Sequence, residues 1–224
     1  MTTALVTGAN KGIGLEIVKQ LIDLGMTVHL GARDPERGEK AAADTGARFV
    51  QLDVADPASV RRAADSLERL DVLVNNAGIT GGRLNSPGDV DTANVREVYE
   101  TNVIGPIIVT EAFLPLLRRS AHGRIVNMSS TVGSLADMMS NDYPDSLAYV
   151  PSKTALNAVT VLYAKKEPGL RVNAGCPGYC ATDLNNHNGI RTAAQGAGIA
   201  VTLATLDDDG PTGGFYDDNG AIAW

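Results

Sequence analysis

A tyrosine and a lysine four residues apart could form a proton-transfer pair in this chain. Tyr149 is the only one of its six tyrosines with a lysine four positions later, Lys153. Residues with this spacing lie above one another on one face of a helix. An ammonium group beside a phenol favours the phenolate, and lowers the phenol pKa from its ordinary value of about 10. Such a tyrosine could release and recover a proton during a reaction near neutral pH.

A glycine-rich turn near the start of the chain could hold a phosphate-bearing cofactor. Gly8, Gly12 and Gly14 follow an expected strand and open an expected helix, which is the context that a dinucleotide-binding turn requires. Glycine permits a tight turn and a close approach of the backbone to a pyrophosphate, which then meets the positive end of the helix. The spacing is Gly-x3-Gly-x-Gly, and any strand–helix turn can collect glycines, so this motif alone is weak evidence.

The elements that must position these residues alternate between strands and helices along the whole chain. Apolar runs predict strands at 3–7, 27–32, 48–52, 71–75, 123–128, 170–174 and 213–216. Helical periodicity and Asp-Pro starts predict helices at 12–24, after Asp34, after Asp56, at 91–118 with an interruption at Gly105-Pro106, at 147–166 and at 192–206. This alternation predicts one α/β domain spanning residues 1–224, a Rossmann-like doubly wound parallel sheet of about seven strands with helices on both faces.

Composition and charge exclude several classes of function. A formal charge of −7 argues against general binding to nucleic acid or to an anionic membrane. Cys176 and Cys180 form a lone Cys-x3-Cys pair, and the three histidines do not cluster, so neither a disulfide framework nor a metal site is expected. The N-terminus is not a secretory signal, and no run approaches the ~20 apolar residues that span a bilayer. We therefore expect a cytoplasmic protein.

Six motifs in order make the chain resemble the short-chain dehydrogenase/reductase family, and within it the carbonyl-reductase-like group. The motifs are Thr-Gly-x3-Gly-Ile-Gly at 7–14, Asn-Asn-Ala-Gly at 75–78, Asn102 in a mid-chain helix, Ser130 after a strand, Tyr149-x3-Lys153, and Pro177-Gly178-x3-Thr182. The match runs from Leu5 to about Tyr216. Each motif could occur by chance, whereas six in register are specific.

The resemblance implies a set of residues around a nicotinamide cofactor. Asp53-Val54 would sit against the adenine, Asn75 would line the adenosine side, and Thr182 would hold the carboxamide of the nicotinamide. Asp53 could instead be a loop residue that caps local amides. The full set implied to bind the cofactor is Gly8, Asn10, Lys11, Gly12, Ile13, Gly14, Arg33, Asp53, Val54, Asn75, Ala77, Gly78, Tyr149, Lys153, Pro177, Gly178 and Thr182.

The end of the second expected strand favours NADPH over NADH. An acidic residue there would accept hydrogen bonds from the ribose 2′-hydroxyl and would repel a 2′-phosphate. This chain has Ala32 at that position, followed by Arg33, which can form a fork onto phosphate, and Lys11 can reach the same place. The competing interpretation, in which Asp34 takes the ribose, is disfavoured because Asp34 precedes Pro35 and is better explained as a helix cap.

The resemblance also implies four catalytic residues. Tyr149 would be the general acid, Ser130 the second hydrogen-bond donor to the substrate oxygen, and Lys153 would lower the tyrosine pKa and bind the nicotinamide ribose. Asn102 would bend its helix and hold a water that links Lys153 to solvent, or could simply cap or kink that helix. Ser129 is an adjacent alternative to Ser130, and Tyr143 lacks a lysine four residues on.

Two segments depart from the compact relatives. Between Ser130 and Tyr149 the interval is longer, and its Met138, Met139 and Tyr143 could either line a substrate cleft or pack the loop onto the domain. Between Thr182 and Thr192 the segment is too short and polar for much of a lid. We therefore expect an open cleft with Tyr179, Leu184 and Trp224 at its rim, in a monomer or homodimer.

These observations predict an NADPH-dependent reductase of ketones or aldehydes that works by direct hydride transfer. The first alternative is the same site working mainly as an alcohol dehydrogenase. The second is a nucleotide-sensing module without catalysis, which would have no need of Tyr149 and Lys153. The third is a methyltransferase, in which Asn-Asn-Ala-Gly and Tyr-x3-Lys would have no role.

Overall fold

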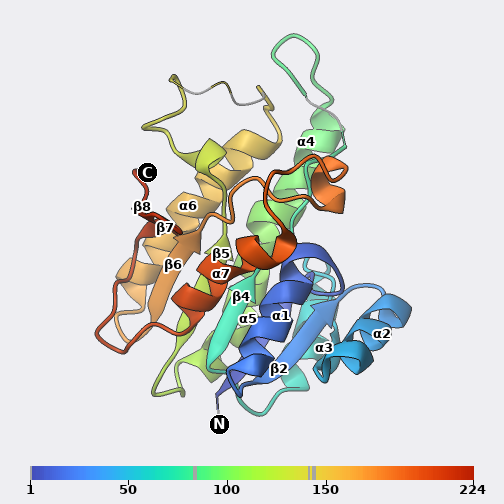
Figure 1. Cartoon of the computed structure of the whole chain (residues 1–224), viewed down its shortest axis with the longest axis vertical. Coiled ribbons are helices and arrows are strands. Elements are labelled where there is room, and N and C mark those ends of the chain that lie inside the picture. The colour runs from blue at the N-terminus through green and yellow to red at the C-terminus, as the bar shows by residue number, and fades with distance from the viewer. Residues whose placement is uncertain (1, 83–84, 141, 143–144) are drawn as a thin grey trace.

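One eight-stranded sheet forms the centre of the molecule (Figure 1). The computed structural model describes residues 2–82, 85–140, 142 and 145–224. The strand order is β3-β2-β1-β4-β5-β6-β7-β8. The strands are β1 Thr3–Thr7, β2 Thr27–Ala32, β3 Arg48–Gln51, β4 Val72–Asn75, β5 Arg124–Met128, β6 Arg171–Gly175, β7 Phe215–Asp217 and β8 Gly220–Ala221. The doubly wound fold predicted from the sequence is confirmed.

The eighth strand was not expected. Strands β1 to β7 pair in parallel, whereas β8 pairs antiparallel with β7. A two-residue turn of Asp218 and Asn219 joins β7 to β8. A strand this short leaves no apolar run in the sequence, which is why it escaped prediction.

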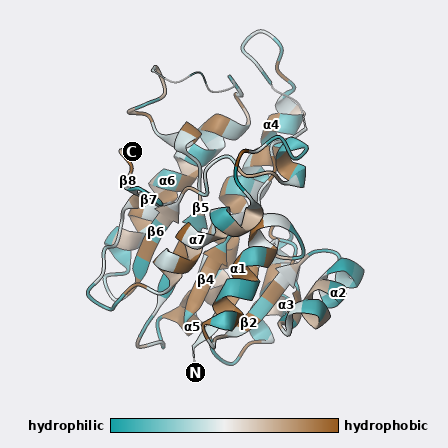
Figure 2. Ribbon diagram, in the orientation of Figure 1, coloured by the Kyte–Doolittle hydropathy of each residue, from teal (hydrophilic) through white to brown (hydrophobic). Residues whose placement is uncertain are grey.

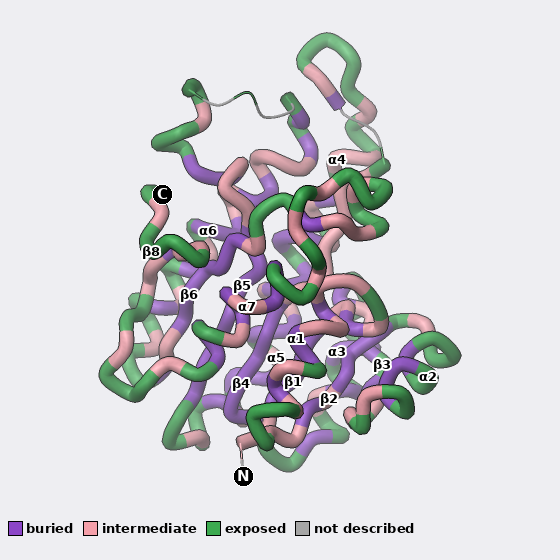
Figure 3. The backbone as a smooth tube through the Cα atoms, viewed as in Figure 1, coloured by how far each residue is buried: buried purple, intermediate pink, exposed green. Residues whose placement is uncertain are grey.

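Helices cover both faces of the sheet, and each face has its own core. The helices are α1 Gly12–Asp23, α2 Pro35–Thr45, α3 Pro57–Asp65, α4 Thr92–Tyr99, α5 Gly105–Leu117, α6 Tyr149–Lys166 and α7 Ala193–Ala204. One core joins the sheet to α1, α2 and α7, and includes Ile17, Leu21 and Leu203. The other joins it to α3, α5 and α6, and includes Val60 and Phe113. The strands between them are apolar and buried (Figures 2 and 3).

Polar residues begin several of these helices as the sequence predicts. Asp34 accepts a hydrogen bond from the Arg37 amide, and Asp56 accepts one from the Ala58 amide, in each case before a proline at the start of the helix. Thr192 forms a capping box with Gln195 at the start of α7. Such caps satisfy backbone donors that the helix itself leaves unpaired.

The helix expected at 91–118 is not interrupted at Gly105-Pro106. Instead α4 continues through a π-helical turn, η1 Glu100–Ile104, directly into α5. Pro106 tolerates this position because the wider turn already changes the hydrogen-bond pattern, with the Gly105 amide donating to the Glu100 carbonyl. The joined helix Thr92–Leu117 is long and apolar enough to cross a membrane by length and composition, but half of its apolar window is buried inside the domain.

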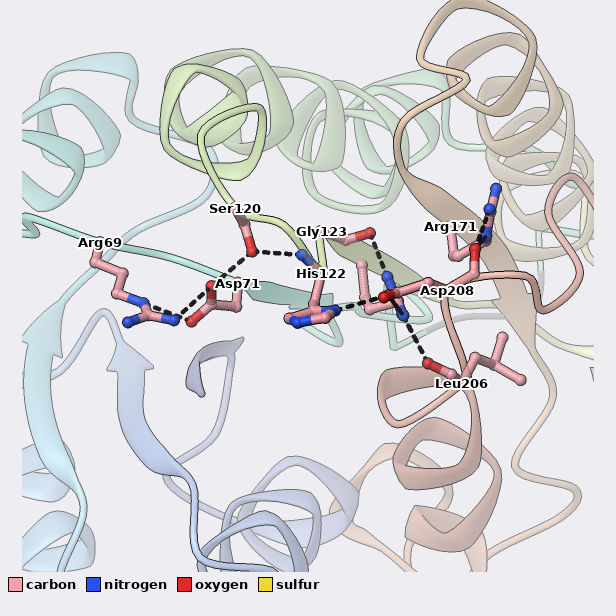
Figure 4. Close-up of polar contacts among 9 residues, drawn as sticks. Arg69, Asp71, Ser120, His122, Gly123, Arg171, Leu206 and Asp208 are labelled. Carbon is pink, nitrogen blue, oxygen red and sulfur yellow. Dashed lines mark hydrogen bonds and ion pairs between the residues drawn. The ribbon is translucent and has the colours of Figure 1, made fainter. Parts of the chain in front are cut away.

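A polar cluster ties the amino ends of the strands together (Figure 4). The Asp71 carboxylate accepts hydrogen bonds from the Thr3 amide at 2.8 Å, the Ser120 hydroxyl at 2.6 Å and the Arg69 guanidinium at 2.8 and 3.1 Å. Nearby, the buried Arg124 guanidinium donates to the Leu206 carbonyl and to the Asp208 carboxylate, the latter at 2.7 Å. These bonds join the first residues of β1 and β5 to the segments that precede β4, β5 and β7.

The opposite edge of the sheet is where a ligand belongs. The strand order reverses between β1 and β4, because the chain leaves β3 at one edge and returns to the centre beside β1. In open α/β sheets, ligands bind at such a switch point, beyond the carboxyl ends of the strands. The long loops that follow β4 and β5 both rise from this end (Figure 1).

Candidate active site

The carboxyl end of β5 and the first turn of α6 bring two hydroxyl groups together. Ser130 lies two residues beyond the end of β5, and Tyr149 is the first residue of α6. Their side-chain hydroxyls are hydrogen-bonded to each other, and both residues are half-buried. The structure thus pairs a serine and a tyrosine hydroxyl beyond the carboxyl end of β5.

Lys153 lies one helical turn after Tyr149 and is buried, with 5 % of its surface exposed. Its Nζ donates to the Met128 carbonyl at 2.8 Å and lies 5.5 Å from the centroid of the Tyr149 ring. Burial lowers the pKa of Lys153 to about 8. The ammonium therefore faces the main chain of β5 and the face of the tyrosine ring.

The expectation that Lys153 lowers the Tyr149 pKa is wrong for this structure. Burial raises the pKa of Tyr149 to about 12, the negative charge of a Cys176 thiolate would raise it further, and the hydrogen bond with Ser130 lowers it. Lys153 is not among the groups that shift it, because its ammonium contacts the ring face and a carbonyl group. At neutral pH the phenol is therefore protonated, which is the state a proton donor needs.

Asn102 is buried inside the π-helical turn η1. Its side-chain amide exchanges two hydrogen bonds with the main chain of Ile79, each 2.9 Å long. Pro106 has no N–H, so the Asn102 carbonyl lacks its α-helical donor. Asn102 thus lies in the π-helical turn and holds the loop after β4 through Ile79. That Asn102 itself bends the helix, and that it holds a water relay, stay predictions.

Ser152 is a site residue that the sequence reasoning missed. Its fully buried hydroxyl accepts a hydrogen bond from the Asn102 amide at 3.0 Å and donates to the Tyr149 carbonyl at 2.6 Å. It therefore links the π-helical turn to the first turn of α6. No motif marks a serine inside Tyr-x3-Lys, so only the geometry could reveal it.

The two adjacent serines after β5 point to different partners. The Ser129 hydroxyl is buried and donates to Asn157 Oδ1 at 2.6 Å, whereas Ser130 meets Tyr149. Cys176 and Cys180 are free, buried thiols. Cys176 also contacts the segment after Ser130, because its Sγ accepts a hydrogen bond from the Thr131 amide at 3.3 Å.

The glycine turn has the geometry of an anion site. Gly8 and Gly12 have φ values of +62° and +57°, in the left-handed region that favours glycine. A Cβ on Gly8 would lie 2.9 Å from the Ala77 Cα, so the turn packs tightly against Asn-Asn-Ala-Gly. Lys11, at the N-cap of α1, gives no side-chain cap to the first turn. That helix start is therefore available to a phosphate group, and the residues present fit a dinucleotide.

Two residues expected to line the cofactor are turned into the protein. Asn75 is buried, and its amide donates to Asn127 Oδ1 at 2.8 Å and to the Thr110 hydroxyl at 3.2 Å. The reason is the alternation of a strand, which places Asn75 on the face covered by α5. Its neighbour Asn76 lies next to the glycine turn, with its side chain donating to the Thr7 carbonyl at 2.9 Å. The Val54 side chain belongs to the core, so only its main chain could meet an adenine.

Asp53 and Arg33 follow the ends of neighbouring strands. The Asp53 carboxylate accepts a hydrogen bond from the Ala55 amide at 3.0 Å, which agrees with the alternative reading of it as a local cap. Arg33 is exposed immediately after β2. Asp34 is occupied as the cap of α2, so it is not free to take a ribose hydroxyl without breaking that cap.

Lys11 has a partner that the sequence did not indicate. Its Nζ lies 2.6 Å from Asp183 Oδ2, in an exposed ion pair between the glycine turn and the segment after β6. His187 Nε2 lies 3.0 Å from the other oxygen of the same carboxylate. The segment 182–187 therefore crosses to the glycine turn.

The remaining predicted residues surround the same end of the sheet. A Cβ on Gly78 would lie 3.3 Å from Asn102 Oδ1 and 3.6 Å from Lys153 Nζ. Gly178, after Pro177, has φ +73°. The Thr182 methyl faces Gly12, and Thr182 is the N-cap residue of η3 Asp183–Asn185. Asn10 and Ile13 are half-buried in the glycine turn.

Comparisons with known proteins show the family to which the chain belongs. The family model described as short chain dehydrogenase matches residues 2–192. The chain is 35% identical to salutaridine reductase of Papaver bracteatum, covering 97% of this chain and 94% of that protein, and 34% identical to carbonyl reductase (NADPH) 3 of Rattus norvegicus, covering 99% and 98%. The crystal structure of NADPH-bound carbonyl reductase from chicken fatty liver superposes with a TM-score of 0.89 at 33% identity, covering 100% of this chain and 99% of that one.

The chain belongs to the short-chain dehydrogenase family, as its motifs predicted. It is an oxidoreductase that uses a nicotinamide cofactor and acts on C=O or CH–OH groups. The alignment with the rat protein runs over 275 positions, more than the 224 residues of this chain. The rat protein therefore carries internal segments that this chain lacks.

Proposed function

We propose that the protein reduces ketones or aldehydes with NADPH, using Tyr149 as the proton donor. The observation that carries the proposal is the hydrogen-bonded pair of Ser130 and Tyr149 hydroxyls, with Tyr149 protonated at neutral pH. This pair lies at the same edge of the sheet as the uncapped start of α1. A protonated phenol suits reduction better than the reverse oxidation, which needs a base.

Hydride transfer leaves negative charge on the carbonyl oxygen of the substrate, and two hydroxyl groups can stabilise that charge. Ser130 donates a hydrogen bond to that oxygen, and Tyr149 donates a hydrogen bond and then its proton. When bound, NADPH supplies the hydride. Lys153 contributes a positive charge to the site. Its pKa of about 8 lies close to neutral pH, so the ammonium can return a proton to Tyr149 after the reaction. Asn102 and Ser152 hold the first turn of α6 in place.

The glycine turn holds the cofactor phosphates, and Arg33 sets the preference for NADPH. Arg33 is exposed beyond β2, and the acid that follows it in the sequence, Asp34, is occupied as a helix cap. The related chicken carbonyl reductase is described as NADPH-bound. Lys11 assists Arg33 after exchanging its Asp183 partner for the 2′-phosphate.

Replacing Arg33 tests this preference. Arg33→Ala should raise the KM for NADPH by about 10-fold, because a charge-assisted pair with phosphate is lost, and leave the KM for NADH nearly unchanged. Steady-state kinetics with both cofactors provides the measurement, and Arg37→Ala, an exposed arginine one turn into α2, is the matched control. A higher kcat/KM with NADH than with NADPH in the wild type would contradict the preference itself.

The substrate cleft of the proposed enzyme is open and takes bulky, largely apolar carbonyl compounds. Leu184 is 44% exposed and Tyr179 55%, which supports a hydrophobic rim, whereas the Trp224 ring stacks on Phe215 of β7. Met139 is almost fully exposed, so it does not pack onto the domain; Tyr143 and Pro144 lie outside the described residues. The related rat protein is named carbonyl reductase (NADPH) 3, which supports a carbonyl compound as the substrate.

The proposal extends to the enzyme in the cell. It works in the cytoplasm, as a monomer or a homodimer, on a small molecule and independently of nucleic acid or membranes. The net charge of −7 and the two free, buried cysteines support this setting.

Replacing Tyr149 with phenylalanine tests the function. With a panel of carbonyl compounds and NADPH, Tyr149→Phe should lower kcat by about 10²- to 10⁴-fold, because the proton donor is lost. The dissociation constant for NADPH should stay within about twofold, because the phenol hydroxyl stabilises the transition state and contributes little to the binding of the cofactor. Tyr163→Phe, on the same helix but bonded to Glu111, is the matched control. Equal turnover in Tyr149→Phe and wild type would refute the assignment.

A further inference from the structure

The segment that follows Ser130 is anchored by the last residues of the chain. Ser134 is fully buried, and its hydroxyl donates to the Ala223 carbonyl at 2.8 Å. Two residues on, the Ala136 amide donates to the Trp224 carbonyl at 3.0 Å. Residues 222–224, here called the C-terminal clamp, thus hold the segment 131–136 across nearly ninety positions of sequence.

The C-terminal clamp is itself fixed to the sheet. The Trp224 ring stacks on Phe215 of β7, with ring centroids 5.5 Å apart and planes 17° from parallel. Phe215 is 1% exposed, and the Ile222 amide donates to its carbonyl at 2.7 Å. The stack therefore fixes Trp224 to a strand of the sheet, so the carbonyl that accepts the hydrogen bond from the Ala136 amide is held in place.

The held segment continues directly from Ser130 and touches the helix that carries Tyr149. The Gly133 amide donates to the Ser130 carbonyl at 2.9 Å, so the turn begins at Ser130 itself. Gly133 packs against the main chain of Lys153, where an added Cβ would lie 2.8 Å from the Lys153 carbonyl carbon. A displacement of this turn would therefore change the position of Ser130 relative to Tyr149.

We propose that the C-terminal clamp positions Ser130 for catalysis, with Trp224 as a positioning residue that never touches the reacting atoms. Cys176 and α6 hold one side of the turn through Thr131 and Gly133, and the clamp holds the other through Ser134 and Ala136. Loss of the clamp loosens the turn and lengthens the Ser130–Tyr149 hydrogen bond. The inference rests on the proposed function, since the affected step is proton donation to a carbonyl.

Trp224→Ala tests the proposal in the full chain with NADPH and a carbonyl compound that the wild type reduces. We expect kcat to fall by about 3- to 30-fold, because small displacements of a reacting geometry lower rates strongly. The dissociation constant for NADPH should stay within about twofold, because the glycine turn is distant from the clamp. Trp224→Phe, which keeps a ring to stack on Phe215, should recover most of kcat.

A second variant and a control separate positioning from general damage. Ser134→Ala removes one clamp bond without touching the ring stack, and its effect on kcat should be less than additive with that of Trp224→Ala, because both loosen one segment. Leu24→Ala, at an exposed apolar residue beyond α1 at the other end of the sheet, should leave kcat unchanged. Amide exchange of residues 131–136 should be faster in Trp224→Ala and unchanged in Leu24→Ala.

The outcomes distinguish the two proposals. An unchanged kcat in Trp224→Ala, or a loss of NADPH affinity as large as the loss in kcat, would overturn the clamp and leave the proposed function standing. Failure of the wild type to reduce any carbonyl compound would overturn the proposed function instead. Equal impairment in Trp224→Phe and Trp224→Ala would also reject the role of the ring stack.

Discussion

At the scale of single residues, Lys153 shows how function opposes stability in this site. Its ammonium is buried beside an aromatic ring and, among the residues that the structure describes, donates one hydrogen bond, to the Met128 carbonyl. Burial lowers its pKa from 10.5 to about 8. Each pKa unit corresponds to about 1.4 kcal/mol, so the charged form is destabilised by roughly 3 kcal/mol in the folded chain.

Lys153→Met should therefore stabilise the protein without its cofactor while removing catalysis. We expect the free energy of unfolding at pH 7 to rise by about 1–2 kcal/mol. The variant removes the cost of burying the ammonium, and the loss of the hydrogen bond to Met128 offsets part of that gain. Between pH 8 and 10.5 the unfolded wild type binds a proton that the folded form has lost, so wild-type stability rises with pH. The advantage of the variant should accordingly shrink from pH 7 to pH 9.5 in urea unfolding. A gap that widens over this range would contradict the burial argument.

At the scale of elements, the sequence predicted almost every strand and helix, because apolar runs and Asp-Pro starts mark them locally. The candidate site could be predicted to the extent that the sequence motifs place Tyr149, Lys153 and Ser130 at the carboxyl edge of the sheet. Asn75 and Asn76 were not distinguished, because a strand that ends between them gives no local sign of which side chain faces the glycine turn. The continuous helix through η1 and the direction of the Lys153 ammonium depend on tertiary packing, which no periodicity records.

At the scale of the molecule, the two ends of the sheet have different tasks. The carboxyl ends of β1, β4 and β5 lead into the glycine turn and the proposed catalytic residues, of which Asn102 and Lys153 are buried. The amino ends of the same strands lie against a polar cluster whose charges are paired, centred on Asp71 (Figure 4). A rigid anchor at one end lets the other end tolerate groups that destabilise the fold, as Lys153 does.

The Asp71 anchor should make the fold sensitive to acid. Burial alone would raise the pKa of Asp71, but the hydrogen bonds from Arg69, Ser120 and the Thr3 amide outweigh it and lower that pKa. A carboxylate with a lowered folded-state pKa contributes stability above its unfolded pKa of about 4. That contribution is lost as the pH falls toward the folded-state pKa.

Asp71→Asn should lower the free energy of unfolding at pH 7 by about 2–4 kcal/mol. The reason is that the amide N–H group of the asparagine would face hydrogen-bond donors of its neighbours in a buried site. In urea unfolding, this difference should shrink below pH 4, whereas Asp65→Asn, at an exposed carboxylate, should differ little from wild type at any pH. A deficit of the Asp71 variant that persists unchanged to pH 3 would show that packing, not charge, makes this residue the anchor of the amino end.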